Sequence, residues 1–150
     1  MNSPKIKIND QEELRTTLLE AFNKITHYQA VKWTKYLIDE VKDLCNFEKE
    51  VAKLIEQSLD YINKFSSQFN EFKAVRSLAF RIHALARQEE SLKNTIGLRT
   101  VSQALSTIHA KDHAIIASDY LIKLINIIYP NDSETVRRIR LKQIEIIKKL

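Results

Sequence analysis

Apolar residues recur along this chain three and four positions apart, which is the spacing of one face of an α-helix. Leu14, Leu18, Phe22 and Ile25 form the first such stripe and predict a helix over residues 11–24. A wider apolar face at residues 27–44 is broad enough for a central helix. Further stripes predict five more helices, within residues 51–62, 72–86, 92–108, 113–128 and 136–150. The pattern therefore predicts an all-α fold of about seven helices.

Polar residues at the segment boundaries predict where the helices begin. Two pairs have the spacing at which each side chain satisfies a free backbone amide of the first turn, Asp10 with Glu13 and Thr26 with Gln29. Three further residues are placed to cap the third, sixth and seventh helices: Asn46, Asp112 and Asp132. Gly97 lies inside the fifth helix, where glycine costs about 1 kcal/mol relative to alanine. A close helix crossing would explain it, and a break in the helix at this residue is the alternative.

The segments between these stripes are only a few residues long, which favours antiparallel neighbours in a compact bundle. We therefore expect residues 1–9 to form a short extended or disordered arm and residues 10–150 to form a single all-helical domain. The composition agrees, because one glycine and two prolines in 150 residues are too few for the turns of an all-β fold or for a phosphate-binding loop.

The chain has one cysteine, Cys45, which cannot form an internal disulfide or a cysteine zinc site. A reducing cytoplasm is the simplest location for such a protein, and we expect Cys45 and the one tryptophan, Trp33, to be core residues. No apolar run has the length of a signal-peptide core or of a membrane span. We therefore expect a cytoplasmic protein without a membrane partner.

Positive charge is concentrated at the carboxyl end of the chain. The net charge is +5, and residues 133–150 hold six basic residues and two acidic ones. A basic patch there would consist of Arg137, Arg138, Arg140 and Lys142. Such a patch could attract nucleic acid with an affinity that falls steeply with salt. Base-stacking aromatic residues are not interleaved with these charges, however, so we prefer the solvated outer face of an amphipathic helix.

Two histidines four residues apart, His109 and His113, would share one face of a continuous helix and could bind a transition metal. His83, Asp112 or Asp119 could supply a further ligand. The metalloprotease arrangement is absent because Ala110 follows the first histidine, and no histidine has a glutamate three residues before it. We prefer a structural role, in which the rings bond backbone carbonyls freed at a helix break. A pH-sensitive or ligand-contacting role and a histidine-based metal protein are the alternatives.

No residue pattern in the sequence points to a specific catalytic reaction. No serine lies in a Gly-x-Ser-x-Gly elbow, and adjacent carboxylates such as Glu12 with Glu13 point apart on a helix. We therefore expect no enzyme, no cofactor and no bound metal.

The most specific run of the chain extends from Arg99 to Tyr120. It contains Gln103-Ala104, Thr107-Ile108-His109 and His113-Ala114, while residues 79–87 read Ala-x-x-x-His-Ala-x-Ala-Arg and residues 30–33 pair an alanine with a tryptophan. Over residues 27–128 the sequence resembles the Imm-5-like family of immunity proteins of bacterial polymorphic toxin systems. High specificity is confined to the last third of that range.

The resemblance implies an all-α cytoplasmic protein that protects its producer by binding a cognate toxin, without a catalytic mechanism. The residues that we expect to shape the binding site are His83, His109, Asp112, His113 and Tyr120. The basic net charge argues against the masking of a cationic nuclease site, so the target should be acidic or be held through apolar contacts. The sequence leaves open whether the chain also pairs with a second copy of itself.

Overall fold

The computed structural model describes residues 3–150, and within that range the chain forms seven α-helices and no β-strand. The helices are α1 (Glu12–Phe22), α2 (His27–Leu44), α3 (Lys49–Lys64), α4 (Phe72–Gln88), α5 (Leu92–Ser106), α6 (His113–Ile128) and α7 (Ser133–Lys148). The predicted all-α bundle is confirmed. Between residues 3 and 150, no helix combines the length and apolar content that a membrane crossing requires.

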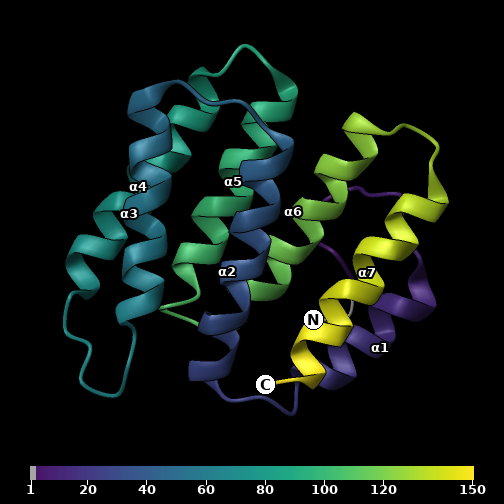
Figure 1. Cartoon of the computed structure of the whole chain (residues 1–150), viewed down its shortest axis with the longest axis horizontal. Coiled ribbons are helices and arrows are strands. Elements are labelled where there is room, and N and C mark those ends of the chain that lie inside the picture. The colour runs from purple at the N-terminus through teal and green to yellow at the C-terminus, as the bar shows by residue number, and fades with distance from the viewer. Residues whose placement is uncertain (1–2) are drawn as a thin grey trace.

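Helix α5 lies at the centre of the molecule and packs most extensively on α6 and α4. Helices α2 to α5 form one group at the left of Figure 1, α1 and α7 pack on each other at the right, and α6 lies between them. The buried apolar side chains form one continuous cluster, which includes Trp33 and Cys45 as expected. Burial raises the pKa of the Cys45 thiol to about 11, so this thiol stays protonated at neutral pH.

Two of the predicted helix starts are confirmed by hydrogen bonds. At the start of α2, the Gln29 amide donates to the Thr26 hydroxyl and the Thr26 amide donates to the Gln29 side chain, at 3.1 and 2.9 Å. At the start of α7, the Thr135 amide donates to the Asp132 carboxylate at 3.0 Å. Local capping geometry therefore fixes these two ends.

The other predicted caps are wrong in detail. Helix α1 begins at Glu12 without a capping side chain, because the Asp10 carboxylate binds Arg140 of α7 instead. Helix α3 begins at Lys49, since the backbone before it is extended, and the carbonyl of Asn46 accepts a hydrogen bond from Asn94. Asp112 occupies the position before α6 but its side chain makes no capping hydrogen bond.

Gly97 lies within an uninterrupted α5, at the place where α5 crosses the end of α2. A Cβ atom at this position would lie 2.8 Å from Cys45 Sγ and 3.2 Å from side-chain atoms of Phe47 and Val41. The predicted close crossing is therefore present, and the absence of a side chain at Gly97 allows it.

This geometry predicts that Gly97→Ala lowers the free energy of unfolding by up to about 2 kcal/mol, because an overpacking cost of about 1 to 3 kcal/mol is offset by a gain in helix propensity of about 1 kcal/mol. Urea denaturation would measure the change. In a Cys45→Ala background the nearest atom is gone, so the same substitution should cost clearly less. An equal cost in both backgrounds would show that the crossing does not limit this position.

Candidate functional site

The two neighbouring histidines lie at the junction between α5 and α6, which is a turn and not a continuous helix. Helix α5 ends at Ser106, whose carbonyl accepts from the amides of His109 and Ala110 at 3.0 and 3.3 Å. His109 therefore lies in the turn, while His113 is the first residue of α6. Their spacing of four residues does not place them on one helical face.

His109 packs its ring against Phe72 at the start of α4, with ring centroids 5.8 Å apart. Its Nε2 atom is buried and has no hydrogen-bond partner among residues 3–150. Burial lowers the pKa of His109, and the charges of Arg76 and His113 lower it further. The ring is therefore neutral at physiological pH.

His113 makes a side-chain hydrogen bond, with Nδ1 2.7 Å from the Gln103 amide oxygen. Burial lowers its pKa and the charge of Lys5 adds to that effect, while Asp112 opposes it. The contact joins the first turn of α6 to the last turn of α5. This arrangement is that of a structural junction.

The sequence predicted that His109 and His113 bond backbone carbonyls freed at a helix break, but a different histidine makes such a contact. His27, at the start of α2, places Nε2 2.6 Å from the carbonyl oxygen of Thr107. Lys111 reaches in the opposite direction, donating to the carbonyl of Ile25 at 2.6 Å. These two contacts connect the turn before α2 with the turn before α6.

The remaining candidate residues do not converge on this junction. His83 lies eleven residues after Phe72 on α4, roughly 16 Å along the helix axis, so it cannot share a ligand with His109. Tyr120 lies two turns along α6 and packs against the core, and Asp112 is exposed. Across the described range, no three His, Cys, Asp or Glu side chains are grouped so as to hold a metal ion.

The strongest polar cluster in the structure lies elsewhere, between α1, α6, α7 and the amino-terminal arm. Both oxygens of Asp119 accept from Arg15, at 2.9 Å each, and one of them also accepts from Arg140 at 2.7 Å. Arg140 is fully buried and also donates to both oxygens of Asp10, at 3.0 and 2.7 Å. Two arginines and two carboxylates thus form a charge-balanced network, which we call the buried ion cluster.

Neutral groups complete the buried ion cluster. The remaining guanidinium nitrogen of Arg140 donates to Gln143 and Ser118, at 2.9 and 3.3 Å. The backbone carbonyl of Gln143 accepts in turn from the Trp33 indole at 3.2 Å, which ties α2 to α7. A signal for this cluster exists in the sequence, because Arg140 shares the inward-facing stripe of α7 with Val136 and Ile147.

The basic patch predicted from the sequence therefore has fewer than the four residues expected. Arg140 does not belong to it, because that side chain is buried and paired with two carboxylates. Lys142 pairs with Glu40 of α2 at 3.0 Å, and Arg137 lies 3.5 Å from Glu134. The exposed charge of α7 is thus partly neutralised by neighbouring carboxylates.

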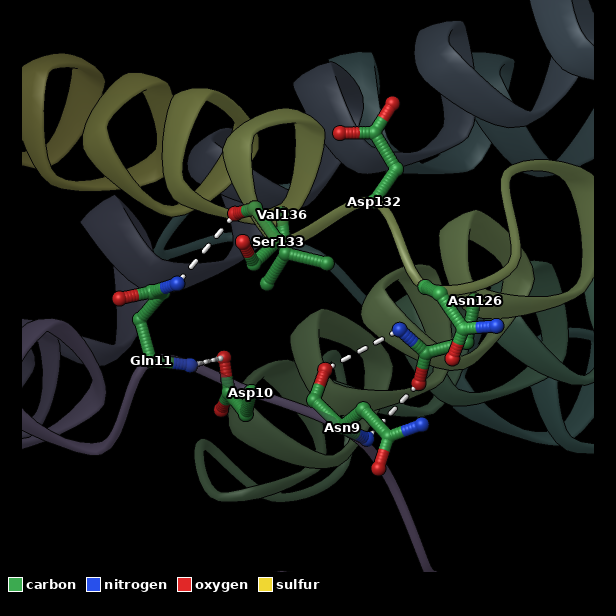
Figure 2. Close-up of a pocket in the computed structure, with 8 residues that line it drawn as sticks. Asn9, Asp10, Gln11, Asn126, Asp132, Ser133 and Val136 are labelled. Carbon is green, nitrogen blue, oxygen red and sulfur yellow. Dashed lines mark hydrogen bonds between the residues drawn. The ribbon is translucent and has the colours of Figure 1, made fainter.

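A polar cavity of about 260 Å³ lies beside the buried ion cluster, between the arm and the loop that joins α6 to α7. In Figure 2 the Asn126 side chain pairs twice with the backbone of Asn9, and the Gln11 side chain donates to the carbonyl of Ser133. Asp132, also at its wall, is committed to capping α7. These contacts hold the arm against α6 and α7.

Comparison with known protein families gives a match. A sequence model of the family described as Imm-5 like putative immunity protein matches residues 20–150, a range that contains α2 to α7 entirely. The chain belongs to this family. No match was found among curated proteins or among solved structures. The Imm-5-like match extends beyond the range of the resemblance seen in the sequence and includes α7, with Arg140.

The buried ion cluster predicts a stability effect specific to this Imm-5-like chain. Asp119→Asn removes a negative charge shared by two buried guanidiniums and should lower the free energy of unfolding by about 3 kcal/mol. Urea denaturation followed by fluorescence of Trp33, the one tryptophan, would measure it. The control is Asp39→Asn, which removes an exposed pair with Lys35 and should cost under about 0.5 kcal/mol. Equal effects would contradict the role of the cluster.

The histidines predict how stability depends on pH. The pKa values of His83, His109 and His113 are all lowered by burial from 6.5, so near and below that pH the unfolded chain binds more protons than the folded one. The contribution of these histidines to the free energy of unfolding should therefore be fully present above about pH 6.5. It should be lost as the pH falls below that value, through the lowered pKa values of the folded state. Urea midpoints between about pH 7.5 and 5.5 would show the slope. Replacing the three histidines with glutamine should flatten it, and an unchanged slope would assign the dependence to other groups.

Proposed function

We propose that this protein is an immunity protein that neutralises a cognate bacterial toxin by stoichiometric binding in the cytoplasm. The observation that carries the proposal is the family match, which extends over residues 20–150. The action is occlusion of the toxin, without turnover of a substrate. It requires neither a metal nor a cofactor.

The distribution of chemically reactive groups supports a binding role. The buried carboxylates of Asp10 and Asp119 are committed to arginines, and the Cys45 thiol is buried with a raised pKa. Loops of three to seven residues join the helices, so the surface is held in one shape before a partner arrives. A preorganised surface loses less entropy on association, which is what tight inhibition needs.

The first experiment is recovery of the partner from the producing cells. The tagged chain is captured at moderate salt after nuclease treatment, and the bound material is identified. We expect one protein in a 1:1 ratio that is toxic when expressed without this chain. Recovery of nucleic acid only in the absence of nuclease, with no protein bound, would overturn the proposal.

The stoichiometry separates occlusion from enzymatic inactivation. Titration of the captured toxin with this chain should abolish toxin activity at a ratio of about 1:1, and the residual activity at lower ratios should not fall with time. An immunity protein that modified its toxin would act at ratios far below one, with inhibition that increases during incubation. Such a time course would contradict binding as the mechanism.

A further inference from the structure

A row of seven aromatic rings lies at one end of the bundle, where α2 begins, α3 gives way to α4, and α5 turns into α6. Successive centroids from Tyr28 to Phe65, Phe69, Phe72 and His109 are 6.4, 5.5, 5.2 and 5.8 Å apart. His27 joins the row through Phe65, and Tyr61 joins it through Phe69. We call these seven residues the ring row; the segments that carry them lie toward the lower edge of Figure 1.

The ring row has a buried base and two exposed members. Phe65 is only 8% exposed, whereas Tyr28 and Phe72 are 50% and 42% exposed. Large apolar side chains that are held by neighbouring rings yet remain open to solvent are typical anchors of protein interfaces. Tyr28 and Phe72 therefore form a prepared contact surface that this chain does not itself cover.

Positive charge surrounds the ring row. The three segments that carry it, residues 24–32, 61–76 and 107–113, contain six basic residues and two acidic ones. Lys32 lies 5.1 Å from the Tyr28 ring centroid and Lys64 lies 5.4 Å from that of Tyr61. Arg76 is exposed one helical turn after Phe72, and its charge acts on His109. The rim of the surface thus favours a negatively charged partner.

We propose that the ring row is the surface through which this chain binds an acidic face of its toxin, an inference that depends on the proposed immunity function. Apolar side chains of the toxin pack on the two exposed rings, while its carboxylates face Arg76 and the exposed Lys24 and Lys73. The apolar contacts hold the complex together, and the charges orient the approach.

Aromatic rings among basic residues also characterise proteins that bind single-stranded nucleic acid. Two observations favour a protein here. The rings pack against one another, so few faces remain for stacking of successive bases. In addition, Lys32 donates to the carbonyls of Ile62 and Asn63 at 2.7 and 2.9 Å, and Lys64 pairs with Glu71, so neither is free to follow a phosphate backbone.

The test measures binding of purified toxin, captured as described above, to matched variants. Tyr28→Ala combined with Phe72→Ala should raise the Kd by about 30-fold or more, as loss of interface anchors does. The control is Phe80→Ala, which removes a phenylalanine of α4 that is 68% exposed but outside the ring row, and it should leave the Kd within about twofold. Circular dichroism and urea midpoints establish that each variant is folded.

A charge variant tests the same surface without disturbing the packed rings. Arg76→Glu should raise the Kd by about tenfold at low salt, with a smaller effect at high salt because the interaction is screened. Its control is Arg138→Glu on α7, which lies on the opposite side of the molecule from α4 in Figure 1 and should have little effect. If the double alanine variant unfolds, the comparison of Arg76→Glu with Arg138→Glu decides the proposal.

Each other result has a defined meaning. Binding of the double alanine and Arg76→Glu variants within about twofold of the wild type would overturn the ring-row surface and leave the immunity function intact. Failure of the wild type to bind or inhibit the toxin would overturn both. Binding of a fluorescent oligothymidine to the wild type, lost in the double alanine variant, would assign the surface to nucleic acid and overturn the proposal.

Discussion

The Asp119 carboxylate, placed between two arginines, is the interaction on which the position of the outer helices depends. Arg15 and Arg140 come from α1 and α7, and Asp119 lies on α6. A buried guanidinium without a nearby carboxylate costs several kcal/mol, so sliding either helix along α6 by one turn would separate charges that must remain together. The cluster therefore sets the register of α1 and α7, whereas apolar contacts alone would tolerate several registers.

The opposite group of helices is organised differently, and this matters for binding. Side chains bonded to backbone carbonyls connect its turns: Lys32 reaches the end of α3, His27 reaches the turn before α6, and Lys111 reaches the turn before α2. The loops before α2 and α6 are thereby connected to each other, and α2 to the end of α3, at the end of the bundle that carries the ring row. A partner meets a surface already ordered during folding, so the entropy of ordering these loops is not lost again on association.

The sequence predicts those features of this structure that depend on near neighbours. Helical periodicity predicts all seven helices, and the pair of Thr26 and Gln29 predicts a cap that forms. The pair of Asp10 and Glu13 looks equivalent, but Asp10 binds an arginine 130 positions away, which no local pattern reveals. Arg140 lies on the inward-facing stripe of α7, but that local pattern does not reveal the distant carboxylates that pair with it. Phe72 fits the apolar stripe of α4, yet the structure leaves it partly exposed because it lies at the end of the helix.

The same distinction between local and distant contacts bears on the proposed binding of a toxin by this basic chain. The positive charges of the buried arginines are cancelled by the carboxylates of Asp10 and Asp119. The charge that a partner can meet therefore lies on exposed side chains. In the proposed complex, the charges around the ring row would act at long range and orient the encounter, while Tyr28 and Phe72 would act only at contact. Charge then sets mainly the association rate and the rings set mainly the dissociation rate. An acidic toxin face with apolar residues at its centre would benefit from both the charge attraction and the ring contacts. A cationic nuclease site would be repelled before any ring could make contact.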